Sequence, residues 1–133
     1  MRLSIAHANE VDGLWPTLKD GFARSLERGQ RDYSTGQIWQ MCRSGNAFLC
    51  LAHTDNDILM ASVWQFRSHE ERFTFHCIAL YGKQLRQWAQ PASDFLKSIA
   101  RDNGATRMTF CGRNGWERLF NAKPNGDIYE VDL

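Results

Sequence analysis

The residues with the clearest chemical potential lie between an apolar run and a predicted helix. Lys83, Arg86 and Gln87 follow the run that ends at Gly82, and they precede a helix predicted to begin at Pro91. Cationic and amide side chains donate hydrogen bonds, and the uncapped N–H groups of a helix N-terminus attract anions. The stretch therefore predicts an anion-binding loop, and phosphate is the anion that it suits.

Two side chains of the preceding run, RFTFHCIALYG, have the chemistry to move protons. An ordinary histidine has a pKa of about 6.5, which makes His76 a candidate general base at neutral pH. A phenol can act as a general acid, and Tyr81 stands at the end of the run. A single histidine among apolar neighbours is also commonly a hydrogen-bonded structural residue, so both interpretations of His76 stay open.

Other residue types offer weaker signals. Trp88 stands beside Arg86, where an exposed ring would stack on an adenine or contact a partner protein, whereas a buried ring would only pack. The four cysteines and four histidines lack the spacing of metal ligands, so we expect no metal site. The apolar surroundings of the cysteines indicate reduced core residues.

Length and charge limit the remaining functions. With 133 residues the chain is long enough for one domain, which we expect to span residues 1–133. A net charge of +1 provides no strong field for nucleic acid, so we expect no nucleic-acid partner. No signal peptide is recognisable, and no apolar run approaches the roughly 20 residues that cross a bilayer. We therefore expect a cytoplasmic protein without a membrane partner.

Hydrophobic periodicity predicts the elements that position these residues. Strand patterns cover residues 1–8, 47–53, 58–66, 72–82, 105–111 and 127–133. Helical spacing covers residues 9–28, 34–44, 91–103 and 116–121. Short polar turns at 54–57 and 67–71 make the three middle strands an antiparallel meander, and a further turn is predicted at 124–126. The result is an α/β (α+β) chain with the order β-α-α-β-β-β-α-β-α-β.

Three helix boundaries carry specific signals. Asn9 offers an N-cap for the first helix, and Pro16 either begins that helix after a short turn or kinks it. Ser34 and Gln37 form a capping-box pattern at the start of the second helix, and Gly45 is suited to its end.

This order of elements resembles the GNAT (Gcn5-related N-acetyltransferase) superfamily over essentially the whole chain. In particular, the segment GRNGWERLF at 112–120 resembles the small, divergent GNAT-like proteins of bacteriophages, which would place the protein in a host cytoplasm. The resemblance implies a single GNAT-like domain with a mixed, mostly antiparallel central sheet flanked by helices.

In the superfamily, the loop before the third helix reads Gln/Arg-x-x-Gly-x-Gly/Ala and holds the pyrophosphate of coenzyme A. The equivalent stretch here is Arg86-x-x-Ala89-x-Pro91, in which both glycines are replaced. Side chains limit how closely a backbone approaches a phosphate, and proline has no N–H. The resemblance therefore implies a coenzyme A site that relies more on side chains, formed by Leu80, Tyr81, Gly82, Lys83, Arg86, Gln87, Trp88 and Ala89.

The family's second signature is an asparagine after the fifth strand, followed by a tyrosine that protonates the departing thiolate. Asn114 matches the asparagine, but the tyrosine position falls on Phe120 or Asn121. Tyr81 and Tyr129 are the remaining candidate acids, and Tyr81, at the end of the fourth strand, is the better placed. The usual glutamate base is also missing, so His76 is the candidate base.

The resemblance implies an acyl-CoA-dependent N-acetyltransferase that transfers an acetyl group from acetyl-CoA to an amine of a protein or small molecule. The reaction would take place where the fourth and fifth strands separate, with backbone N–H groups of residues 80–82 polarising the thioester carbonyl. The alternative is a GNAT-shaped protein that has lost catalysis and docks on a host protein. Missing glycines and the missing tyrosine favour the alternative, whereas the retained cationic stretch favours the enzyme. Exposed apolar edges would support a homodimer.

Overall fold

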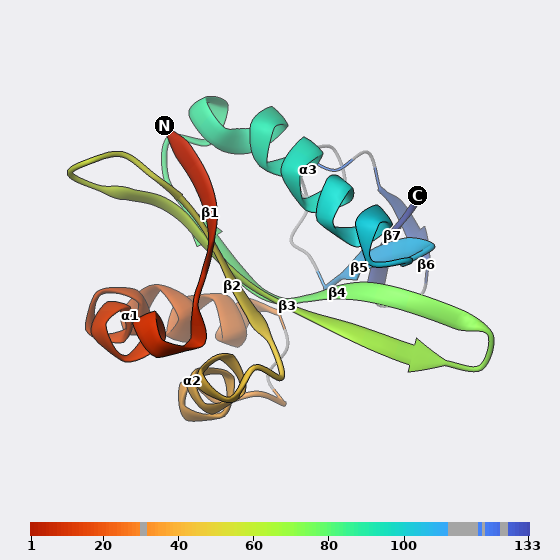
Figure 1. Ribbon diagram of the computed structural model, residues 1–133, viewed down its shortest axis with the longest axis horizontal. Coiled ribbons are helices and arrows are strands. Elements are labelled where there is room, and N and C mark those ends of the chain that lie inside the picture. The colour runs from red at the N-terminus through yellow and green to blue at the C-terminus, as the bar shows by residue number, and fades with distance from the viewer. Residues whose placement is uncertain (30–31, 112–119, 121, 126–127) are drawn as a thin grey trace.

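The order of strands and helices largely follows the predicted periodicity. The computed structural model describes residues 1–29, 32–111, 120, 122–125 and 128–133 (Figure 1). The helices within these residues are α1 (Val11–Arg28), α2 (Thr35–Ser44) and α3 (Leu85–Asp102), and a 3₁₀ turn, Ala8–Glu10, precedes α1. The strands are β1 (Arg2–Ala6), β2 (Phe48–His53), β3 (Ile58–His69), β4 (Arg72–Gly82), β5 (Arg107–Phe110), β6 (Lys123–Asn125) and β7 (Ile128–Asp132).

These strands form one sheet in the order β1-β2-β3-β4-β5-β7-β6. Neighbouring strands are antiparallel except for β4 and β5, which are parallel and are connected through α3. The predicted meander is β2, β3 and β4. The prediction of a mixed, mostly antiparallel sheet flanked by helices is therefore confirmed.

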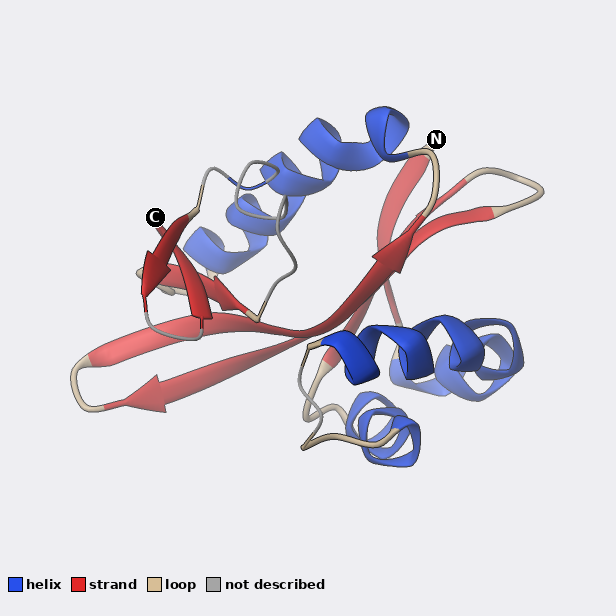
Figure 2. Ribbon diagram, turned by 180° about the vertical axis from the view of Figure 1, so that it is seen from behind, coloured by secondary structure: helices blue, strands red, loops and turns tan. Residues whose placement is uncertain are grey.

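Helices cover both faces of the sheet. Helices α1 and α2 lie against one face and α3 lies against the other (Figures 1 and 2). One core packs Leu18 and Phe22 of α1 against the sheet, and the other packs Leu96 of α3 near Trp64 and Phe75. Two covered faces explain why the middle strands read as continuous apolar runs rather than strict alternations.

The two N-terminal helices follow most of their predicted signals. Ser34 Oγ accepts from the Gln37 N–H at 3.1 Å, and the Gln37 side chain accepts from the Ser34 N–H at 2.7 Å, so the capping box is confirmed. Gly45 ends α2 in the left-handed conformation, with φ of 84°. Pro16 lies inside α1, and Asn9 lies in the 3₁₀ turn, so the prediction of Asn9 as the cap is wrong.

Helix α3 begins at Leu85, six residues before the predicted start, and Pro91 lies in its interior. The apolar stripe of Ala92 and Leu96 continues four residues upstream to Trp88, whose side chain is only 1% exposed. The indole N–H donates to the Lys83 carbonyl at 2.8 Å and anchors the first turn. The predicted long cationic loop is therefore wrong, because most of it is helix.

Two predicted turns and the predicted fourth helix have different outcomes. The predicted turn at 124–126 overlaps β6, in which Pro124 pairs with Tyr129 of β7. The predicted fourth helix falls almost entirely on residues outside those that the structure describes. In the middle hairpin, β3 extends to His69, which shortens the predicted turn at 67–71 to Glu70 and Glu71.

Candidate functional site

Strand β4 changes its register at Ile78. Val63 of β3 pairs with Ala79, but the next residue, Trp64, pairs with Cys77, so Ile78 is an extra residue on β4. Such a bulge interrupts the alternation of side chains between the two faces. Ile78 and Ala79 both join the core under α1 and α2, whereas Cys77 joins the core under α3.

The parallel pairing of β4 with β5 ends beside this bulge. It runs from Thr74 opposite Arg107 to Cys77 opposite Phe110, and β4 then continues for five more residues to Gly82. No described strand pairs with that continuation on the β5 side. Residues 79–82 therefore have β3 as their one strand partner within the described part of the chain, and we call them the open half of β4.

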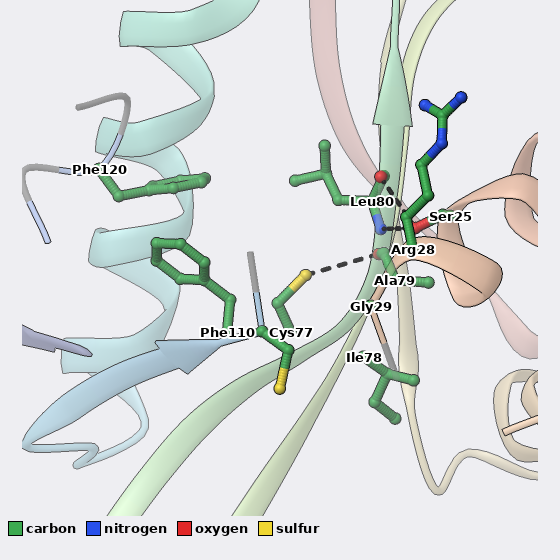
Figure 3. A pocket seen from close by; sticks show the side chains of 10 residues that line it. Ser25, Arg28, Gly29, Cys77, Ile78, Ala79, Leu80, Phe110 and Phe120 are labelled. Atoms are coloured by element: carbon green, nitrogen blue, oxygen red, sulfur yellow. Dashed lines mark hydrogen bonds between the residues drawn. The ribbon is translucent and has the colours of Figure 1, made fainter. Parts of the chain in front are cut away.

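A cavity of about 30 Å³ lies where the two strands part (Figure 3). The C-terminal end of α1 contributes part of its wall, β4 contributes the bulge, and Phe110, Cys111 and Phe120 contribute the opposite side. A small-molecule site usually has about 300 Å³ or more, so this cavity holds only a water-sized group as it stands.

A side chain of α1 forms hydrogen bonds with the backbone of the open half of β4. Ser25 Oγ donates to the Leu80 carbonyl at 3.1 Å and accepts from the Leu80 N–H, also at 3.1 Å (Figure 3). One hydroxyl of α1 thus satisfies both backbone groups that face away from β3. No short-range sequence signal could have identified Ser25, because it is 55 residues away from Leu80 in the chain.

The start of α3 presents the groups expected for an anion. The first N–H groups of a helix have no partner within it, and here they belong to Leu85, Arg86 and Gln87. The Gln87 N–H donates to the Gln84 carbonyl at 2.9 Å, so the N–H groups of Leu85 and Arg86 are the candidates for an anion. Arg86 is exposed beside them. These groups fit a phosphate in charge and hydrogen-bonding capacity, although Ala89 lies a full turn into the helix.

Lys83 is held by an ion pair. Its ammonium lies 2.6 Å from a carboxylate oxygen of Asp57 in the β2–β3 turn, and the contact lowers the pKa of that carboxyl. The Lys83 N–H donates to the Leu59 carbonyl at 2.8 Å. A phosphate at the start of α3 would therefore compete with Asp57 for this ammonium.

Gly82 and Trp88 have packing roles at the same corner. A Cβ atom at Gly82 would lie 2.7 Å from the Leu59 oxygen and 2.8 Å from the Trp88 ring, so no side chain fits there. Because the Trp88 ring is buried against this glycine, the interpretation of an exposed ring that stacks on an adenine is wrong, and the packing interpretation holds.

His76 lies in the part of β4 that is paired on both sides. It is 5% exposed, and Nδ1 lies 2.7 Å from Thr109 Oγ1 in a hydrogen bond. Burial, together with the charges of Arg67 and Arg107, lowers the pKa of His76 to about 4. The imidazole is therefore neutral at pH 7 and a weak proton acceptor, which removes the premise of an ordinary pKa on which its role as a base was predicted.

Tyr81 points toward α1. Its ring packs edge-on against Phe22 with centroids 5.1 Å apart, and it covers Gly21, where any side chain would clash with the ring. Burial raises the pKa of the phenol, so the hydroxyl stays protonated at neutral pH. Tyr81 lines a groove of about 310 Å³ that also includes Arg24, Asp57 and Lys83.

The remaining sequence-based expectations concern the family's second signature, metal sites and membrane spans. Asn114 lies outside the described residues. Phe120, at the position of the expected tyrosine, is buried against Trp64 and Phe110 at the cavity. No group of three or more His, Cys, Asp or Glu residues in the described part of the chain could hold a metal ion. Among the described helices, none has the length and apolar character needed to span a bilayer.

Comparisons with solved structures define the fold. A polyamine N-acetyltransferase from Drosophila melanogaster superposes with a TM-score of 0.69 at 10% identity, covering 99% of this chain and all of that one. Gcn5 from Tetrahymena gives 0.67 at 13% identity over 100% and 96% of the two chains. A GNAT family acetyltransferase from Brucella melitensis, solved with acetyl-CoA, gives 0.56 at 17% identity over 99% and 88%. The chain has the GNAT fold.

The comparisons leave the finer resemblance open. No protein-family model and no curated protein matches the chain by sequence. The solved structures named above give no support to the resemblance to bacteriophage proteins. At these identities the likeness concerns the fold, so activity must be argued from the residues of this chain.

Proposed function

We propose that this protein is an acyl-CoA-dependent N-acetyltransferase with its acyl-CoA site along the open half of β4. The observation that carries this proposal is that the pairing of β4 with β5 ends after Cys77, beside the bulge at Ile78. In a strand, the N–H and C=O of alternate residues point to the same side. Leu80 and Gly82 therefore direct their backbone groups to the open edge, next to the start of α3.

Acyl-CoA has the chemistry that this edge and helix terminus require. Its pantetheine arm contains amides that can pair with a strand edge, and its pyrophosphate can accept from the first N–H groups of α3. Arg86 and, after exchange with Asp57, Lys83 would add charge. The GNAT-fold protein from Brucella melitensis was solved with acetyl-CoA, which supports the same class of ligand for this fold.

In the reaction, an amine nitrogen would attack the thioester carbonyl carbon, the C–S bond would break, and coenzyme A would leave as a thiolate. A backbone N–H of the open half would stabilise the oxyanion. Tyr81 would donate the proton that the thiolate needs; burial raises the pKa of its phenol, which keeps the hydroxyl protonated and makes it a weaker acid than an ordinary phenol. His76 would be a poor acceptor for the proton of the amine, because it is buried and its pKa is about 4, so that proton would pass through water to the bulk solvent.

A second function, binding without catalysis, is favoured by one observation. Ser25 already satisfies Leu80, and the cavity at the strand separation is about 30 Å³. A protein that never admits acyl-CoA would keep this closed arrangement and use its surface to bind a protein partner, a host protein in the case of a bacteriophage origin.

Thermal unfolding with acetyl-CoA separates the two functions. A ligand at a hundred times its Kd stabilises a protein by about 2.7 kcal/mol, which is a clear shift of the midpoint. We expect such a shift, together with release of free coenzyme A thiol when a suitable amine is added. No shift at millimolar acetyl-CoA would exclude the enzyme and leave the binding protein.

Charge reversal locates the ligand. Arg86→Glu and Lys83→Glu should each reduce the shift, whereas Arg101→Glu, at the other end of the same helix, should leave it unchanged. An equal response of all three variants would show that the phosphates do not bind at the start of α3.

A further inference from the structure

Ser25 performs the task of a missing neighbouring strand. In the paired half of β4, the β5 backbone supplies hydrogen-bonding partners at the same edge. Beyond Cys77, the Ser25 hydroxyl supplies one donor and one acceptor to the same residue, Leu80, at 3.1 Å each. A serine hydroxyl has one proton and two lone pairs, so it can satisfy both groups at once.

Any ligand that lies along this edge has to replace that arrangement. An acyl or pantetheine carbonyl would accept from the Leu80 N–H, which in the free protein donates to Ser25 Oγ. Two acceptors cannot share this N–H with good geometry. The ligand and the Ser25 hydroxyl therefore compete for one backbone donor.

The surroundings give the displaced side chain somewhere to go. Ser25 is half-buried three residues before the end of α1, and it lines the small cavity together with Arg28 and Gly29. Figure 3 shows its hydroxyl between α1 and the backbone of β4. Rotation of the side chain would free the Leu80 N–H without a change in the helix.

We propose that the Ser25 hydroxyl occupies the hydrogen-bonding position of the acyl-CoA arm on Leu80, and that acyl-CoA binds by displacing it. This inference rests on the proposed acyl-CoA site. Ser25 is then an affinity-determining residue: the free protein is held closed by two hydrogen bonds, and the ligand must break the one from the Leu80 N–H. Removing the hydroxyl removes the competitor and leaves the backbone donor available.

Titration of the intact protein with acetyl-CoA tests this inference. Ser25→Ala should bind acetyl-CoA more tightly than the unmodified protein, by about three- to tenfold, as the net worth of one hydrogen bond predicts. The matched control is Ser44→Ala, an exposed helical serine whose hydroxyl donates to the Met41 carbonyl and accepts from the Asn46 side chain, away from β4, and its affinity should not change.

Hydrogen exchange of the Leu80 amide provides a readout that does not depend on affinity. In the free protein, Ser25→Ala should exchange this amide faster than the unmodified chain, and saturating acetyl-CoA should protect it equally in both.

Equal or weaker affinity of Ser25→Ala, with the unmodified protein still binding, would overturn this inference alone. Failure of both proteins to bind millimolar acetyl-CoA would overturn the proposed function and the inference together. If Ser25→Ala binds acetyl-CoA and the unmodified protein does not, the result would support both the proposed function and this inference.

Discussion

The two halves of β4 have the same strand on one side and different partners on the other. Residues 72–77 lie between β3 and β5 and have strands on both sides. Residues 79–82 have β3 on one side, and on the other side the Ser25 hydroxyl of α1 bonds to Leu80. In the paired half, Phe73 and Phe75 pack against aromatic rings of β3. In the open half, rotation of the Ser25 side chain would release the backbone groups of Leu80. We therefore expect substitutions in the first half to cost more stability, and we propose the second half as the binding edge.

The largest effect should come from the core of the paired half. Phe75 is fully buried and stacks on Trp64 with ring centroids 4.8 Å apart. Phe75→Ala should lower the free energy of unfolding by about 3 to 5 kcal/mol, because it removes apolar contacts and leaves a cavity. Urea denaturation measures this loss. A cost under about 1 kcal/mol would contradict the division between the halves.

The second effect concerns pH and also belongs to the paired half. The folded pKa of His76 is about 4, below the ordinary value of about 6.5, so the unfolded chain binds more protons between these values. The contribution of the neutral His76 to the free energy of unfolding is fully present above pH 6.5. As the pH falls from 6.5 toward 4, the free energy of unfolding decreases by about 3 kcal/mol.

Replacement with glutamine isolates this contribution. His76→Gln cannot titrate, but its amide can still bond to Thr109. Its unfolding free energy should depend less steeply on pH in the same window. Parallel curves for both proteins would show that His76 has an ordinary pKa in the folded state.

A smaller effect is expected in the open half. Ser25→Ala removes two hydrogen bonds at a half-buried site whose backbone groups water can reach once the hydroxyl is gone. The loss should be about 1 kcal/mol, well below that of Phe75→Ala. Thermal or urea unfolding gives the comparison. A loss as large as that of Phe75→Ala would mean that the open half is a structural seal.

The smallest effect is expected at the exposed ion pair beside the open half. Lys83→Met should leave the unfolding midpoint nearly unchanged, because both partners are largely in contact with solvent. The pKa of Asp57 should rise toward its ordinary range, since the Lys83 ammonium is what lowers it. An NMR titration of the carboxyl carbon measures this, and an unchanged pKa would show that the pair does not form in solution.

The sequence predicted those parts of the fold that depend on local signals. Alternation and apolar runs gave the strands around residues 48–82, and the capping box of Ser34 and Gln37 gave the start of α2. Pro91 is typical of a first helical turn and so predicts too late a start for α3, although Trp88 continues the stripe one turn earlier. Pro124 is likewise typical of a turn, whereas β6 at the end of the sheet tolerates it.

The candidate site was predictable in position but not in detail. The resemblance to the GNAT superfamily, which rests on element order, implied that the fourth and fifth strands would separate near residues 80–82. The contact between Ser25 and Leu80 depends on how α1 packs on β4, and no local pattern encodes it. The pKa of His76 likewise depends on Arg67 of β3 and Arg107 of β5, which only the folded sheet brings close.

One measurement tests the central claim most directly: an amide NMR titration of the intact protein with acetyl-CoA. The account predicts that the amides of Leu80, Gly82 and Arg86 shift with a single affinity, while those of Thr74 and Phe75 in the paired half stay in place. Shifts confined to other surfaces, or no shifts at millimolar acetyl-CoA, would contradict the assignment of the open half of β4 as an acyl-CoA site.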